Sequence, residues 1–101
     1  MNIAFHYMYR DGANYKNFNT VIFDNSINFP IEKLNESLKD KLIGEEYFYI
    51  NHWKLPDLHF GSWDDEFDHE FHTFEGIEYT NEKPNSEITL TEFILLIEKT
   101  D

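Results

Sequence analysis

The sequence contains no cysteine among its 101 residues. Disulfide cross-links, thiolate zinc sites and cysteine nucleophiles are therefore excluded. Glycine is also scarce, and the four glycines match neither the phosphate-binding P-loop nor the dinucleotide-binding fingerprint. The four serines, at positions 26, 37, 62 and 86, stand in no nucleophile motif. The sequence thus gives no indication of covalent catalysis or nucleotide binding, and it favours a protein that is not an enzyme.

Basic residues are few, because eight Lys and Arg oppose twenty Asp and Glu and leave a net charge of -12 with histidine neutral. Binding to phosphate groups needs a basic stripe, so we expect neither direct nucleic-acid binding nor attachment to anionic membranes. No window approaches the roughly 18 apolar residues of a membrane-spanning helix, and the N-terminus lacks the pattern of a signal peptide. We therefore expect a cytoplasmic protein with a basic protein partner.

Aromatic side chains are abundant. Ten Phe, six Tyr and two Trp make up 18% of the chain, and hydrophobic residues in total make up 41%. So many large apolar side chains favour a packed core over disorder, despite the charge. A chain of this length has room for one core, so we predict a single domain over residues 1–101.

The first half of the chain predicts a hairpin followed by a helix. Residues 2–10 alternate as a strand does, and a second β-prone run covers residues 18–23 after the turn formers of residues 11–14. Pro30 suits a first helical turn, and apolar residues then recur at spacings of three and four. We predict a helix over residues 30–43 that buries Ile31, Leu34, Leu38 and Leu42.

The second half predicts two strands and a short helix. Residues 45–50 are aromatic and β-prone, and residues 69–79 alternate, with Phe71, Thr73, Glu75, Ile77 and Tyr79 on one side. Thr89 and Glu92 have the spacing of a capping box before a C-terminal helix. The fold class is therefore α+β: a small antiparallel sheet of about four strands with two helices packed on one face, in the order β-β-α-β-β-α.

One segment has two interpretations. A helical turn over residues 62–68 followed by a strand is favoured, but Trp63, Phe67, Phe71 and Phe74 also recur at the spacing of one continuous helix through residue 74. The choice affects which side chains share a face.

An uncompensated acidic stretch is the main candidate site. The twenty-eight residues between Lys54 and Lys83 contain nine acids and no Lys or Arg. Aromatic residues lie among and before these acids, as they do in interfaces where a ring fills a pocket and charges steer the encounter. The candidate partner-binding residues are Trp53, Asp57, Trp63, Asp64, Asp65, Glu66, Asp68, Glu70, Glu75 and Glu78. A solvated face that keeps the protein soluble is the alternative interpretation.

Histidines suggest a rival site. His59, Asp65, His69 and His72 carry the imidazole and carboxylate ligands that zinc, manganese or iron accept. On a continuous helix, Asp65, His69 and His72 stand at i, i+4 and i+7 and converge, whereas on a strand His69 and His72 point to opposite faces. No recognised metal-ligand motif is present, so we expect no metal or other cofactor. His6 and His52 are interpreted as structural or surface residues.

A short, acidic, aromatic-rich chain without a catalytic motif is similar in general character to many bacterial immunity proteins and phage-encoded inhibitors. This likeness of class carries over no residues. It implies an inhibitor or an immunity or antitoxin protein that covers a basic surface, such as the nucleic-acid groove of a nuclease. The alternatives are a metal-dependent hydrolase that uses the histidine and aspartate cluster, and a domain that binds a small ligand in an aromatic pocket.

Overall fold

The computed structural model describes residues 1–59 and 71–100, which form a four-stranded sheet and three helices. The elements are β1 (Asn2–Arg10), β2 (Lys16–Phe23), α1 (Ile31–Lys41), β3 (Tyr47–Tyr49), α2 (Ile50–Trp53), β4 (Phe71–Thr80) and α3 (Leu90–Glu98). The predicted α+β class and antiparallel sheet are confirmed. The short helix α2 is additional to the two predicted helices.

The sheet has the strand order β2-β1-β4-β3, and every neighbouring pair is antiparallel. The β1–β2 hairpin runs from the pair Ile3–Phe23 to the pair Arg10–Lys16. Its loop is stabilised by Asp11, whose carboxylate accepts hydrogen bonds from the backbone N–H groups of Ala13 (3.0 Å) and Tyr15 (2.8 Å). The predicted hairpin with a loop longer than two residues is thus confirmed.

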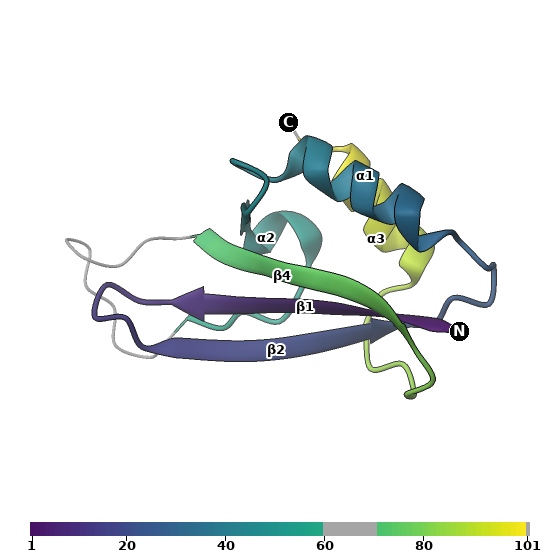
Figure 1. Cartoon of the computed structure of the whole chain (residues 1–101), viewed down its shortest axis with the longest axis horizontal. Coiled ribbons are helices and arrows are strands. Elements are labelled where there is room, and N and C mark those ends of the chain that lie inside the picture. Colours follow the sequence, from purple (N-terminus) through teal and green to yellow (C-terminus); the bar gives the residue numbers. More distant parts are fainter. Residues whose placement is uncertain (60–70, 101) are drawn as a thin grey trace.

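All three helices lie on the same side of the sheet (Figure 1). The side chains of Ile3, Phe5, Tyr7 and Tyr9 face them, and each is at most 1% exposed. From the helix layer, Phe93 stacks on Phe23 with ring centroids 4.5 Å apart. This face of the sheet is therefore the core, as expected for an antiparallel sheet with one covered face.

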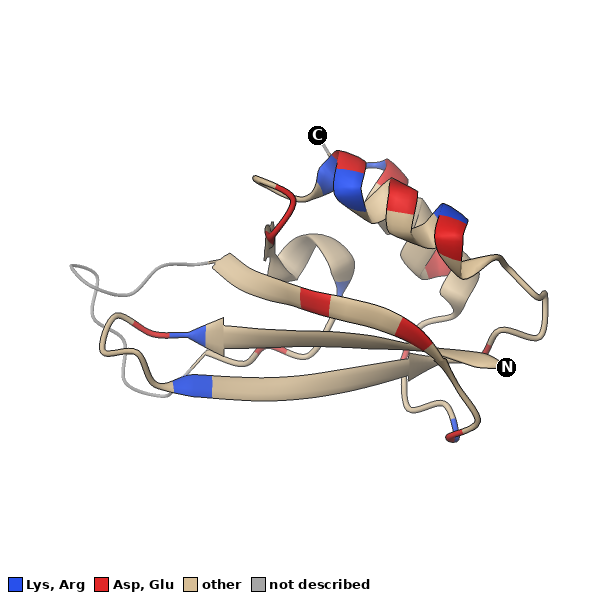
Figure 2. Ribbon diagram, viewed as in Figure 1, with Lys and Arg blue, Asp and Glu red and all other residues tan. Residues whose placement is uncertain are grey.

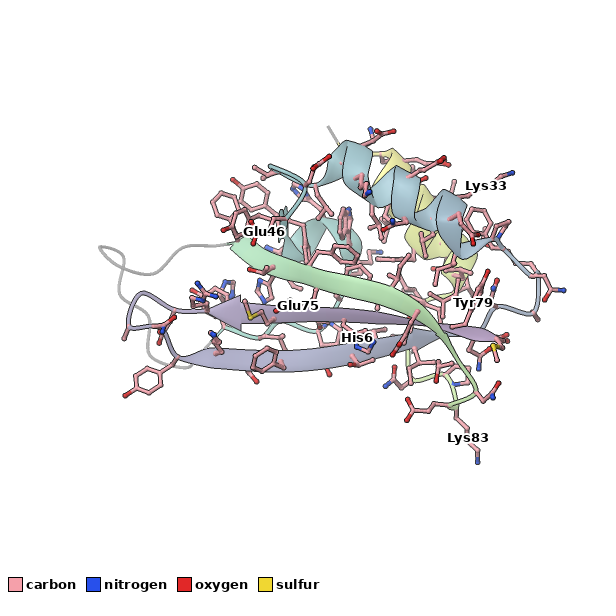
Figure 3. All side chains as sticks on the ribbon, in the orientation of Figure 1. His6, Lys33, Glu46, Glu75, Tyr79 and Lys83 are labelled. Atoms are coloured by element: carbon pink, nitrogen blue, oxygen red, sulfur yellow. The ribbon has the colours of Figure 1, made fainter. Side chains whose placement is uncertain are left out.

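Helix α1 follows the predicted pattern with one exception. Leu34 and Leu38 are at most 1% exposed and Leu42 is 6% exposed, but Ile31 is only half-buried. Ile31 lies in the first turn, where its backbone N–H donates a 3.0 Å hydrogen bond to the hydroxyl of Tyr79. Figure 3 shows Tyr79 reaching towards the beginning of this helix. A side chain from β4 thus satisfies one of the unpaired N–H groups at the helix N-terminus.

The predicted capping box at the start of α3 is confirmed. The hydroxyl of Thr89 accepts a 3.1 Å hydrogen bond from the backbone N–H of Glu92 and lies 3.2 Å from the Glu92 carboxylate. The helix then buries Leu90, Phe93 and Ile97.

Strand β4 contains a bulge that the sequence pattern did not predict. His6 pairs with Gly76, but the next residue of β1, Tyr7, pairs with Phe74, so Glu75 is the extra residue. Gly76 has a φ of 144°, which side chains rarely adopt. The bulge changes the alternation, so that Phe74 and Ile77 both pack on the core. The prediction that Thr73 and Ile77 share a side was therefore wrong, as was a continuous helix through residue 74.

No helix in the described part of the chain is long and apolar enough to cross a membrane.

Candidate functional site

Trp53, one of the predicted partner-binding residues, lies in the core. It is 0% exposed, its ring stacks on Phe48 at 4.7 Å, and its indole N–H donates a 2.8 Å hydrogen bond to the hydroxyl of Thr100. Both the apolar and the polar parts of the side chain are satisfied inside the protein. The prediction that this ring contacts a partner was wrong, because α2 turns it towards α3.

The other predicted partner-binding residues differ in where they lie. Trp63, Asp64, Asp65, Glu66, Asp68 and Glu70 lie outside the described residues, as do Asp65 and His69 of the metal hypothesis. Glu75 and Glu78 are exposed on β4, where Glu78 forms a 2.9 Å contact with His6. Figure 3 shows Glu75 on β4 and His6 on the neighbouring β1. Asp57, by contrast, contacts side chains on the core side of the sheet.

The second face of the sheet carries an apolar row that runs across all four strands. Phe18 pairs with Met8, Met8 with Thr73, and Thr73 with Tyr47, so the four side chains are neighbours on one face. Phe18 is 63% exposed and Tyr47 is 37% exposed, whereas Met8 and Thr73 between them are buried, at 6% and 7%. We call these four residues the open-face row.

Further aromatic contacts extend the open-face row at the β3 edge. The ring of Phe71 lies 6.0 Å from that of Tyr47 and 4.9 Å from that of Tyr49. None of the described helices covers this face, since all of them lie on the other side of the sheet (Figure 1). The hydrophobic alternation in β1 distinguishes the two faces of that strand, but only the pairing of all four strands aligns these residues in one row.

Charge is distributed unevenly among the elements. The described residues include all eight Lys and Arg but only fourteen of the twenty acids. Acidic and basic residues are mixed along α1, whereas the visible length of β4 carries acids only (Figure 2). The helix layer is therefore partly neutralised, and the sheet contributes an acidic flank through Glu75 and Glu78.

Asp57, His59 and His72 form the second candidate site. The Asp57 carboxylate oxygen Oδ1 lies 2.7 Å from Nδ1 of His59 and 3.6 Å from Nε2 of His72. The same oxygen accepts a 2.9 Å hydrogen bond from the backbone N–H of His59. His59 and His72, which the sequence grouped, lie close together here with Asp57, which the sequence did not name for this role; the predicted Asp65 lies outside the described residues. The local pattern Asp-x-His, read together with a histidine on a nearby strand, was the available signal.

The rings around these histidines hold them in place. His72 is 0% exposed, and its ring centroid lies 5.1 Å from that of Tyr9 and 6.0 Å from that of Phe48. Its Nε2 atom accepts a 3.1 Å hydrogen bond from the backbone N–H of Leu58. Because a backbone N–H can only donate, Nε2 carries the lone pair and the neutral ring is protonated at Nδ1.

Opposing effects set the charge state of Asp57. Partial burial favours its neutral form, but hydrogen bonds from the backbone and ring of His59, with the attraction of His59 and His72 in their protonated forms, outweigh burial and lower the pKa of Asp57. The carboxylate is therefore ionised over the neutral pH range and is a strong acceptor beside two imidazoles.

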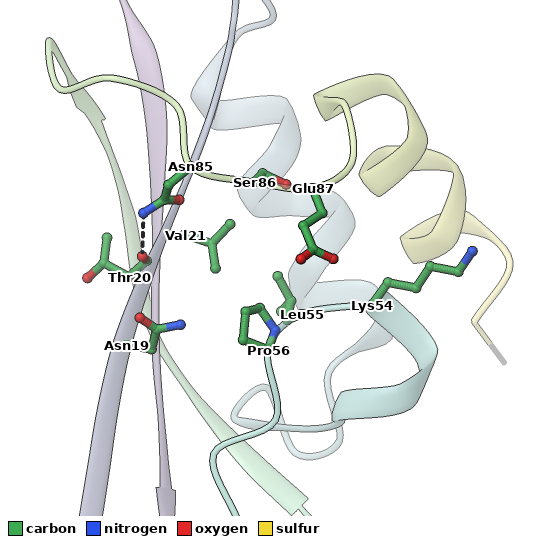
Figure 4. A pocket seen from close by; sticks show the side chains of 9 residues that line it. All are labelled: Asn19, Thr20, Val21, Lys54, Leu55, Pro56, Asn85, Ser86 and Glu87. Atoms are coloured by element: carbon green, nitrogen blue, oxygen red, sulfur yellow. Dashed lines mark hydrogen bonds between the residues drawn. The ribbon is translucent and has the colours of Figure 1, made fainter.

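A polar pocket of about 290 Å³ lies between the β2 edge and two loops (Figure 4). Asn85 forms one wall: its Oδ1 accepts a 2.7 Å hydrogen bond from the Ile22 N–H, and its Nδ2 lies 3.4 Å from the Thr20 carbonyl oxygen. These bonds imitate a neighbouring strand and cover part of an edge. The pocket has no aromatic lining, and a second pocket beside Trp53 that has one measures about 70 Å³. Neither matches the hypothesis of an aromatic ligand pocket, since ligand sites usually measure about 300–1,000 Å³ and are largely apolar.

Comparison of the chain with protein-family models, with curated proteins and with solved structures gives no significant match.

Proposed function

We propose that this chain is a protein-interaction domain, of the inhibitor, immunity or antitoxin kind, that binds a basic surface on another protein. The observation that carries the proposal is the open-face row of Phe18, Met8, Thr73 and Tyr47, which faces away from the helices. Exposed aromatic side chains beside an acidic flank combine a desolvated anchor with electrostatic steering.

The apolar part of this surface supplies the affinity. Phe18 is mostly exposed, so a partner side chain placed over its ring would remove apolar area from water, whereas the neighbouring Met8 is already buried. Tyr47 adds a hydroxyl group at the edge of the sheet and rests against Phe71. Rigid aromatic residues lose little conformational freedom on binding, which favours them as anchors.

The net charge of -12 supports a basic partner. Glu75 and Glu78 are exposed farther along β4 from the open-face row, and a partner of like charge would be repelled at long range. A basic nucleic-acid groove on a nuclease suits this surface, because carboxylates can take the places of phosphates there. Arg10 and Lys16 pair two residues beyond Met8 and Phe18 on the same face, so this basic end of the hairpin would orient a bound partner.

Phe18 on the sheet and Leu95 on helix α3 are both exposed apolar side chains, so they allow a matched test. After a partner has been isolated from the native host by affinity capture and purified, Phe18→Ser is expected to weaken its binding at least about tenfold, mainly through faster dissociation. Leu95→Ser on α3, where Leu95 is 48% exposed, is the control and should bind like the original protein. Binding should also weaken as ionic strength rises.

Two results would contradict the proposal. One is a purified partner that binds equally well to the Phe18→Ser and Leu95→Ser variants. The other is concentration-dependent dimerisation, measured by sedimentation, that Phe18→Ser abolishes and Leu95→Ser does not. That outcome would assign the open-face row to contacts between two copies of the chain.

The alternative function, a metal-dependent hydrolase, is favoured by the closeness of Asp57, His59 and His72. A catalytic metal needs an open coordination position for water or substrate. The deepest of these three side chains, His72, is fully buried and lies among aromatic rings. This environment suits a structural role better than hydrolysis.

A further inference from the structure

We propose that Asp57, His59 and His72 bind one divalent transition-metal ion, of which Zn²⁺ best matches the donors, and that the ion joins the segment around residues 57–59 to β4. Each residue offers one ligand atom, and these atoms lie within 4.8 Å of one another. The inference is independent of the open-face row. It concerns a structural site and requires no catalytic activity.

The spacing of the three ligand atoms is close to that of a metal site. Zinc lies about 2.0–2.2 Å from nitrogen and oxygen ligands, so neighbouring ligands of a tetrahedral ion stand about 3.3 Å apart. The distances from Oδ1 of Asp57 to Nδ1 of His59 and to Nε2 of His72 are 2.7 and 3.6 Å. One is slightly shorter and the other slightly longer than this value. The two histidine ligand atoms lie within 4.8 Å of each other, so the loop must also adjust this third distance before the geometry is tetrahedral.

The fold fixes one ligand and leaves the other two adjustable. His72 is held on β4 by the rings of Tyr9 and Phe48, with no exposed surface. The side chains of Asp57 and His59 are 57% and 22% exposed. A metal ion can thus arrive from solvent on the carboxylate side and meet a rigid imidazole beneath. Water completes the coordination shell.

The donor types select the ion. Two imidazole nitrogens with one carboxylate oxygen suit zinc and related transition metals, whereas Mg²⁺ and Ca²⁺ prefer oxygen ligands alone. The negative charge of the chain raises the local concentration of any cation, so charge alone does not distinguish the proposed site from other acidic groups. Selectivity for Zn²⁺ or Co²⁺ over Mg²⁺ is therefore part of the proposal.

Metal binding must replace two existing hydrogen bonds. The Leu58 N–H occupies the Nε2 lone pair of His72 at 3.1 Å, and His59 Nδ1 contacts the Asp57 carboxylate at 2.7 Å. The ion takes both positions, and the neutral ring of His59 then carries its proton on Nε2 instead of Nδ1, with no net release of a proton. Leu58 loses its acceptor in the same step. Its amide therefore reports directly on occupation of the site.

The test uses Co²⁺ and Zn²⁺ with the full chain after treatment with chelator. We expect about one Co²⁺ per chain with visible absorption bands, displacement by Zn²⁺, and a shift of the Leu58 amide resonance. Asp57→Asn and His59→Gln should each weaken binding at least about tenfold, because each removes one ligand. His52→Gln and Glu78→Gln are the matched controls, since they remove a histidine and an acid elsewhere, and both should retain binding.

Several outcomes would overturn the inference. These are the absence of Co²⁺ bands, binding that survives Asp57→Asn and His59→Gln, or binding lost equally in the two controls. Circular dichroism establishes that each variant is folded. If both ligand variants fail to fold, the Leu58 amide of the original protein decides, because its resonance must move with Zn²⁺ and not with the same concentration of Mg²⁺.

Discussion

The hydroxyl of Tyr7 donates a 2.6 Å hydrogen bond to the backbone carbonyl of Pro56 and thereby ties the central strand β1 to the segment that contains Asp57. The same hydroxyl accepts a 3.1 Å hydrogen bond from the side-chain amide of Asn19. Tyr7 is 1% exposed, so neither partner can readily exchange this group for water. One side chain thus connects β1, β2 and the connection that follows α2.

Tyr7→Phe removes this connection while it preserves the ring. We expect a loss of about 1–3 kcal/mol in the free energy of unfolding, because the change leaves buried polar groups without a partner. Urea denaturation measures the loss. Tyr15→Phe is the control, since Tyr15 is 68% exposed and should lie within about 0.5 kcal/mol of the original protein. Equal stability of the two variants would show that the Tyr7 hydroxyl contributes nothing.

The pH dependence of stability provides a second test of Tyr7. Burial raises the pKa of Tyr7 above its usual value, the hydrogen bond from Asn19 partly opposes this, and the charge of Asp57 adds to the increase. Between pH 10.0 and the higher pKa of the folded state, the unfolded chain loses this proton while the folded chain keeps it. The stability contributed by the Tyr7 proton is therefore fully present below pH 10.0 and is lost as the pH rises through the higher pKa of the folded state.

Tyr7→Phe should show a smaller alkaline loss of stability than the original protein, because the variant has no proton to lose at this position. The measurement is the urea midpoint at a series of pH values from neutral to strongly alkaline. Tyr15→Phe again serves as the control for the other tyrosines. If the Tyr7→Phe and original curves remain parallel throughout, the raised pKa of Tyr7 has no consequence for stability.

The parts of the fold that follow from local chemistry could be predicted from the sequence. The alternation of side chains along residues 2–10 indicated β1, the spacing of Leu34 and Leu38 indicated α1, and Thr89 with Glu92 indicated the start of α3. These signals depend on neighbours within a few residues, so one chain segment contains all of the information.

Features that depend on distant pairing could not be predicted in this way. The bulge at Glu75 lies in the pairing of β4 with the distant strand β1, and no local pattern specifies it. Trp53 was placed at a partner surface because it follows aromatic residues and precedes an acidic stretch, but α2 directs it to the core. The pairing of Asp57 with His72 likewise spans two elements that only the folded chain brings together.

Leu38 tests the core of the helix layer. It is 0% exposed, so Leu38→Ala should cost about 2–5 kcal/mol through lost burial and a residual cavity. Ile31→Ala should cost less, because Ile31 is half-buried. Thermal or urea unfolding of both variants measures the difference. An unchanged midpoint for Leu38→Ala would refute the assignment of this helix face to the core.

Gly76 tests whether the β4 bulge depends on backbone conformation. A methyl group at this position would meet no atom within 4 Å, so a packing clash does not explain the choice of glycine. Its φ of 144° lies in a region that other residues rarely adopt. Gly76→Ala should therefore destabilise the protein by about 1–3 kcal/mol, the usual cost of one strained residue. Gly44→Asn is the matched control, because Gly44 has a φ of 60°, which asparagine tolerates better than most residues. Urea denaturation should give Gly76→Ala a clearly lower free energy of unfolding than Gly44→Asn. The opposite order would mean that β4 can form its bulge without the glycine. In that case, the core contacts of Phe74 and Ile77 would set the change of faces between these two residues.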